Sequence, residues 1–189
     1  MPITSPAVSG LVAASLASVG NTGIAAPLLA AGVGNGVSTW TPQIVVMTVD
    51  VGSAGAGSGG PIPVVVPGSL VGTMTGSFVS FGIKGIAAPQ MATAIANALI
   101  QAFLQGVIKT THAGVGVGAG VATFRAPPAG PLMVAGFKSA GLNGTFAEPL
   151  ALAVGSALDT TFASLVIPVQ IVGSASPTGA SGTGLGQII

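Results

Sequence analysis

Charged side chains are nearly absent from this sequence. Of its 189 residues, four are Lys or Arg and three are Asp or Glu, so charged residues make up 4% of the chain, whereas about 25% is usual for soluble domains. A free monomer relies on surface charge for hydration and for repulsion of its neighbours. An uncharged surface suits permanent contact with other subunits, because no ion has to be desolvated. We therefore expect a structural protein that remains covered within a larger assembly.

Other scarce residue types exclude several kinds of site. Cys is absent, so the chain has no disulfide framework and no thiolate metal site. Metal sites need three or four donors, and His112 is the sole histidine. The acids Asp50, Glu148 and Asp159 recur at no equivalent position, and no Gly-x-Ser-x-Gly motif is present. We expect no catalytic activity, no metal and no cofactor. A net charge of +1 without a basic cluster also argues against a nucleic-acid partner.

Long uncharged windows raise the question of a membrane span. The best candidate, Gly85 to Ile108, carries a polar stripe at helical spacing. A lipid-facing helix would not keep such a stripe uncovered, so the sequence argues against a span. We interpret the stripe either as a solvated helix face or as an uncharged contact face. Its main members are Gln90, Asn97, Gln101 and Gln105.

A motif that occurs three times dominates what the chain does contain. It consists of an apolar residue, x, Ser, x, Gly, x, x, Gly and then Pro four or five residues later, and it recurs at nearly equal intervals along the chain. Internal periods of this kind indicate repeated structural units. We predict three units, at residues 1–60, 61–125 and 126–189. The shared residues are Ser18, Gly20, Gly23 and Pro27; Ser80, Gly82, Gly85 and Pro89; and Ser139, Gly141, Gly144 and Pro149.

Each unit is predicted to run helix, corner, helix, strand and glycine tract. Glycine ends a helix by adopting left-handed backbone angles, and proline suits the first turn of the next helix. The predicted first helices are 9–19, 69–81 and 131–140, and the predicted second helices are 24–40, 86–106 and 146–165. β-branched runs predict strands at 43–49, 107–111 and 166–172. Glycine tracts follow at 52–60, 114–120 and 179–186, and proline-rich linkers at 61–67 and 126–131.

These units together predict an α+β fold. One unit of this size has little core of its own, so we expect the three to close around a pseudo-threefold axis as one compact domain; a short open array of stacked units is the alternative. The glycine tracts are expected to lie against the other copies or a neighbouring subunit. His112 follows Asp50 by the interval that separates the first two motif prolines, and we interpret it as a strand-end residue satisfied by backbone or water. A ligand role near the axis is the alternative, although the third copy is apolar near Val172.

The repeated corner and the end of the chain, Gly182-Thr-Gly-Leu-Gly-Gln-Ile-Ile189, carry a family likeness. The chain resembles the small Ala/Gly/Thr-rich virion structural proteins of tailed bacteriophages, in particular those of tails and baseplates. The resemblance implies a place in a virion, assembled in the host cytoplasm, or in a related contractile machine. A pseudo-threefold protein would suit a trimeric spike or hub. The chain lacks the arginine motif and the metal-binding histidines of the proline-alanine-alanine-arginine repeat tips, and no functional residue is carried over.

Three functions remain open from the sequence. The first is a baseplate or spike-associated component bound to a trimeric partner. The second is a capsid cement protein at threefold positions of a head lattice, which copy number would separate from the first. The third is a membrane-associated assembly protein. In each of the first two, the isolated chain is expected to be poorly soluble or to self-associate, because uncharged apolar surface is then exposed.

Overall fold

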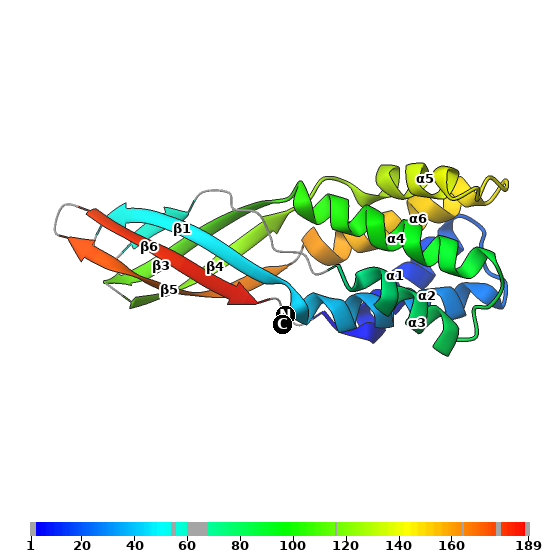
Figure 1. Ribbon diagram of the computed structural model, residues 1–189, viewed down its shortest axis with the longest axis horizontal. Coiled ribbons are helices and arrows are strands. Elements are labelled where there is room, and N and C mark those ends of the chain that lie inside the picture. The colour runs from blue at the N-terminus through cyan, green and yellow to red at the C-terminus, as the bar shows by residue number, and fades with distance from the viewer. Residues whose placement is uncertain are drawn as a thin grey trace.

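The computed structural model describes residues 3–53, 56–59, 68–115, 117–163, 165–176 and 179–187, with side chains described over 3–44, 68–106 and 123–163 and at Leu165 and Ile167. Helices gather at one end of an elongated molecule and strands at the other (Figure 1). The helices are α1 Ser5–Ser18, α2 Ala25–Trp40, α3 Leu70–Ser80, α4 Ala87–Leu104, α5 Ala129–Ser139 and α6 Ala147–Ala163, and a 3₁₀ turn, Thr41–Gln43, extends α2.

The six described helices close into a ring. Each packs against the next along the chain, and α6 packs against α1. The seams α1–α2, α3–α4 and α5–α6 lie within the predicted units, and the seams α2–α3, α4–α5 and α6–α1 join one unit to another. One continuous hydrophobic core contains side chains from all six helices.

The inner face of the ring follows helical periodicity. Rows of buried residues recur four residues apart in the first helix of each unit, and three or four apart in the second. This spacing places each row on the side of its helix that faces the core. They are Val8, Val12 and Leu16; Leu70, Met74 and Phe78; and Ala129, Met133 and Phe137 in the first helices, and Ala30, Val33, Val37 and Thr41; Ala92, Ile95, Leu99 and Phe103; and Ala151, Val154, Leu158 and Phe162 in the second.

Glycines within α2 let its neighbours approach closely. A Cβ atom at Gly32 would lie 2.9 Å from Cδ1 of Phe78, and one at Gly36 would lie 2.9 Å from Sδ of Met74. Both neighbours are on α3, whereas a Cβ at Gly34 would collide with α1. Glycine costs about 1 kcal/mol relative to alanine in a helix interior. The alternation Gly-Val-Gly-Asn-Gly therefore allows α2 to pack closely against α1 on one side and α3 on the other.

An aromatic cluster lies where the helix ring meets the strands. The Phe103 ring stacks on Phe124 with centroids 4.6 Å apart, and it meets Phe162 edge-on at 4.8 Å and Trp40 edge-on at 5.2 Å. Phe103 and Phe124 come from the second predicted unit, Trp40 from the first and Phe162 from the third. The cluster therefore ties all three units together.

The strands form a closed barrel in which every neighbour is antiparallel. They are β1 Val45–Ser53, β2 Ala56–Gly59, β3 Val107–Val115, β4 Val117–Arg125, β5 Val166–Ser176 and β6 Gly179–Gln187. Consecutive strands within a unit form a hairpin. The second strand of each unit then pairs with the first strand of the next, as β2–β3, β4–β5 and β6–β1. Each unit thereby shares backbone hydrogen bonds with both others.

The predicted α+β class is wrong. Among the residues whose side chains the structure describes, 73% are helical, 3% lie in strands, and they form no sheet. The prediction assumed that each helix pair would be completed by its own strand. Instead, the helices bury their apolar faces mainly against one another, and the β-branched runs lead away from the ring (Figure 1). The helices therefore form a ring at one end of the molecule, and Phe124 and Ile167 of the strands join its core.

The predicted contact of the glycine tracts with the other copies is confirmed, and their secondary structure is corrected. Residues 179–186 lie within β6, and 117–120 begin β4, so the tracts supply second strands of hairpins rather than segments that follow a single strand. In the first unit, the tract is divided between β1 and β2. The register places Gly57 opposite His112, Gly120 opposite Val169 and Gly182 opposite Asp50. Each tract thus lies against the next unit.

Two of the helix starts differ from the prediction by more than one residue. α1 begins at Ser5 rather than at residue 9, because Pro6 fits the first turn of a helix. α5 begins at Ala129 rather than at residue 131, and the N–H of Ala129 donates to Oδ1 of Asp159 at 2.9 Å. The predicted linker 126–131 therefore runs into α5. The linker 61–67 lies outside the described residues.

The buried residues give a second measure of the interval between units, beside the motif prolines. The buried residues Val33 and Ile95 are separated by the same interval as the first two motif prolines. The next interval, from Ile95 to Val154, is one position shorter than the one between the second and third prolines. The start of α6 follows the start of α4 by the same interval that separates Pro89 from Pro149. Pro149 is therefore the third residue of α6, as Pro89 is of α4.

Substitution of Phe103 tests the aromatic cluster. We expect Phe103→Ala to lower the free energy of unfolding by about 3–5 kcal/mol, because it leaves a cavity between the three units. Urea denaturation followed by fluorescence of Trp40, the only tryptophan, measures this directly. The matched control is Leu104→Ala, whose side chain is 57% exposed and which should change stability by less than about 0.5 kcal/mol. Equal effects at both positions would contradict the central role of the cluster.

Candidate functional site

The first helix of every unit ends in the same hydrogen-bonded turn. Gly20, Gly82 and Gly141 have φ angles of 79°, 79° and 77°. Their N–H groups donate to the carbonyl three residues earlier at 3.0–3.1 Å, and the next N–H donates to the carbonyl five residues earlier at 2.9 Å in all three corners. This pair of bonds is the Schellman motif, which requires the left-handed angles that glycine adopts without strain.

The remaining motif residues are less uniform. Among the second glycines, Gly85 has a positive φ of 106°, and Gly23 and Gly144 do not. The prolines Pro27, Pro89 and Pro149 each occupy the third residue of the following helix, where no intrahelical N–H donor is needed. The hydroxyls of Ser18 and Ser80 donate to the carbonyls of Ser15 and Ser77 at 2.7 and 2.8 Å. Ser139 instead lines a groove between α4 and α5.

All three corners lie at the end of the ring farthest from the strands (Figure 1). Each corner joins the two helices of a unit, and the second helix then runs back toward the barrel. We call this the corner end and define it by residues 19–24, 81–86 and 140–146. The recurring motif therefore gathers on one surface of the molecule.

Large apolar side chains at the corner end point into solvent. Ile24, Ile86 and Phe146 immediately precede α2, α4 and α6, and they are 89%, 86% and 68% exposed. These three residues were not predicted from the sequence. The sequence does contain a signal, because an apolar residue stands directly before the second helix in every unit.

Charge at the corner end differs from one corner to the next. The second corner carries the exposed Lys84. The third is flanked by Lys138 and Glu148, whose Nζ and Oε2 atoms are 3.4 Å apart. The first corner, residues 19–24, contains no charged residue. The apolar residues are thus common to all three corners, whereas the charges are not.

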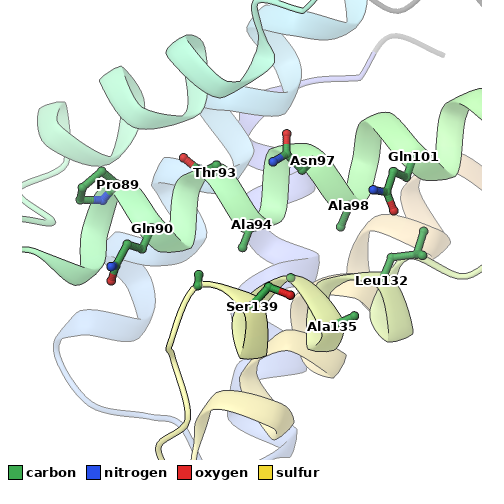
Figure 2. A pocket seen from close by; sticks show the side chains of 12 residues that line it. Pro89, Gln90, Thr93, Ala94, Asn97, Ala98, Gln101, Leu132, Ala135 and Ser139 are labelled. Carbon is green, nitrogen blue, oxygen red and sulfur yellow. The ribbon is translucent and has the colours of Figure 1, made fainter.

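The predicted polar stripe borders a groove of about 580 Å³ between α4 and α5. Gln90, Asn97 and Gln101 belong to its lining together with Thr93, and Gln105 follows α4 without lining it. Figure 2 shows the small side chains of α4, such as Ala94, turned toward α5. The structure therefore brings together three of the four residues predicted as a contact face.

The two corresponding seams differ in one polar contact. Between α2 and α3, the Nδ2 atom of Asn35 donates to Oγ of Ser77 at 3.0 Å. Asn97 corresponds to Asn35, but Gly136 stands where Ser77 does and offers no hydroxyl. The backbone at Gly136 instead lies close to Ala94, since a Cβ there would be 3.3 Å from the Ala94 Cβ. The α4–α5 seam therefore lacks the hydrogen bond that joins α2 to α3.

A second cavity of about 490 Å³ lies beside the aromatic cluster and has Asp159 and Arg125 in its lining. Asp159 binds the first N–H of α5 through Oδ1. Burial raises the pKa of Asp159 above its ordinary value of 3.8, although the hydrogen bond from Ala129 acts in the opposite direction. Asp159 therefore acts as a cap for α5, contributed by the neighbouring helix.

Asp50 and His112 lie in β1 and β3, and their side chains are outside the described residues. Among the residues that are described, no group of three metal-binding side chains comes together. None of the described helices, α4 included, has the length and apolarity needed to cross a bilayer.

Paired glycine substitutions test the corner geometry. We expect Gly82→Ala to destabilise the protein by about 1–2 kcal/mol, since φ is positive there and a left-handed residue with a Cβ is strained. Gly76→Ala is the control, because this exposed glycine lies within α3, and neither position has an atom within 4 Å of an added Cβ. The control should stabilise by up to about 1 kcal/mol. Urea midpoints that move in the same direction for both variants would contradict the assignment.

Asp159→Asn tests the buried carboxyl. A raised folded-state pKa means that the folded protein holds this proton more tightly than the unfolded chain does. The stabilisation of the folded state by this proton is complete at pH values below 3.8, the ordinary pKa. It is lost as the pH rises through the raised pKa of the folded state. Asparagine keeps the acceptor for Ala129, so its stability relative to wild type should rise over this window. Asp159→Ala should be less stable than Asp159→Asn at every pH, and parallel wild-type and Asn profiles in denaturant titrations would refute the shift.

No protein-family model, curated protein or solved structure matches this chain. The resemblance to phage virion proteins therefore stays a prediction from the sequence.

Proposed function

We propose that the chain is a non-enzymatic structural component of a large assembly, of the virion or contractile-tail type, and that it binds a trimeric partner. The observation that carries the proposal is the closed ring of three helix pairs in a single polypeptide. A homotrimer presents three identical surfaces around its axis, and a matching protein must offer three comparable surfaces. One copy of this chain can do so.

The repeated geometry supports this stoichiometry. The capping glycines of the three Schellman corners have φ angles of 79°, 79° and 77°, and the N–H that follows each of them donates at 2.9 Å. The exposed apolar residues that follow these corners occupy one end of the molecule. Because three linked contacts act together, each bound contact raises the effective concentration of the others. Three contacts that are each weak can then hold the chain stably on the partner's axis.

The shortage of charge supports permanent burial. With four basic and three acidic residues in the whole chain, the free protein has little electrostatic repulsion to keep copies apart. Isolated apolar residues on a surface are ordinary, but residues as exposed as Ile24 and Ile86 at repeated positions favour a partner that covers them. A component that is always assembled does not need surface charge for its own solubility.

Copy number tests the proposed function. We expect one copy of the chain for three copies of its partner, as measured by native mass spectrometry of the assembly isolated from cells that encode it. The chain expressed alone should self-associate or precipitate at low ionic strength. Six or twelve copies per tail would contradict placement on an axis, and hundreds per particle would instead select the capsid-cement function. A soluble monomer at high concentration would contradict the burial argument.

A further inference from the structure

We propose that the corner end is the docking surface for the trimeric partner and that Ile24, Ile86 and Phe146 are the three anchors that enter equivalent apolar recesses around its axis. This inference rests on the proposed function and adds the surface, the orientation and the residues. The barrel would then point away from the partner. Three independent observations support this docking mode.

The first observation is the position of the anchors in their helices. Ile24 and Ile86 directly precede α2 and α4 and already have helical backbone angles. The N–H groups of Ala26, Ala88 and Ala147 donate to the carbonyls of Gly23, Gly85 and Gly144 at 2.9, 3.2 and 2.8 Å, so Phe146 holds the same place in the third unit. Every unit therefore sets an apolar side chain at the same exposed position where its second helix begins.

The second observation is that the anchors pack little against the rest of the chain. Their exposed fractions show that most of each side chain contacts no other part of the chain. A large apolar side chain that is mostly exposed at three corresponding positions is explained by an external contact. Exposed aromatic and aliphatic side chains that fit recesses are the usual anchors of protein interfaces.

The third observation concerns the symmetry and size of the partner. The anchors are common to the three corners, while Lys84 and the Lys138–Glu148 pair are not, so the shared chemistry is apolar and threefold. A ring of six helices at the usual spacing of about 9 Å has an end face on the order of 600 Å². That is below the roughly 800 Å² per partner of a standard interface. A second copy abutting end to end would be limited to this face, whereas a trimer can also enclose its rim.

The test places a photo-crosslinking amino acid, p-benzoylphenylalanine, at positions 24, 86 and 146 in turn, in the cells that encode the chain. The control position is Leu104, an exposed apolar residue at the opposite end of α4. We expect the three corner positions to cross-link to one and the same polypeptide and position 104 not to do so. That polypeptide should be a homotrimer by itself and should form a 1:3 complex with the chain.

Binding of the purified trimer then measures the anchors. Ile24→Asn, Ile86→Asn and Phe146→Asn should each weaken binding about tenfold or more, and Leu104→Asn should leave it unchanged. Trp40 fluorescence and urea midpoints close to those of wild type show that the variants are folded. Because the three side chains are mostly exposed, the substitutions should change the free energy of unfolding by less than about 0.5 kcal/mol, which separates loss of binding from loss of folding.

The outcomes distinguish this inference from the proposed function. Cross-linking of the trimer from position 104 but not from the corners would overturn the docking surface and leave the function standing. Cross-linking of the corners to a second copy of the chain, or to lipid alone, would overturn both. Unchanged affinity in the three corner variants would overturn the anchors.

Discussion

The three helix pairs depend on one another because none of them can bury its own inner face. A segment of this size encloses too little volume for a separate core, and the buried side chains of all six helices form one cluster. Phe103 lies at the point where the units converge, in contact with rings from the first and third units. The ring is therefore one cooperative body, in which loss of any unit exposes the faces of the other two.

Small residues make this closed ring possible. Where helices of a pair cross, a Cβ at Gly155 of α6 would collide with the backbone of Gly130 in α5, as one at Gly34 would with α1. Close approach lets a core of modest side chains reach the packing density of a protein interior. It also leaves most of the outer helix surface to Ala, Ser, Thr and Gly, so the shortage of charge and the close helix packing are consequences of one composition.

Much of the helical part could be predicted from the sequence, and the rest could not for identifiable reasons. The motif at Gly20, Gly82 and Gly141 locates each corner because a left-handed helix end requires glycine. The class of the fold was predicted wrongly, since local β-branched patterns do not reveal that the strands leave the helices and pair across units. The groove beside Gln90 depends on how α4 and α5 pack, a tertiary detail that periodicity does not contain. The exposure of Ile24 likewise depends on how the chain turns at the corner, which the sequence pattern does not contain.

Fusing three units into one chain allows them to differ where a true homotrimer could not. The α2–α3 seam is closed by the Asn35–Ser77 hydrogen bond, and the α4–α5 seam is open. Likewise, one corner bears Lys84 and another an ion pair. A threefold partner would meet the same apolar anchor at each corner but a different charge beside it. The shared residues would then provide the affinity. The differences in charge would make the three positions on the partner inequivalent, as is needed when a single further component must attach on the axis.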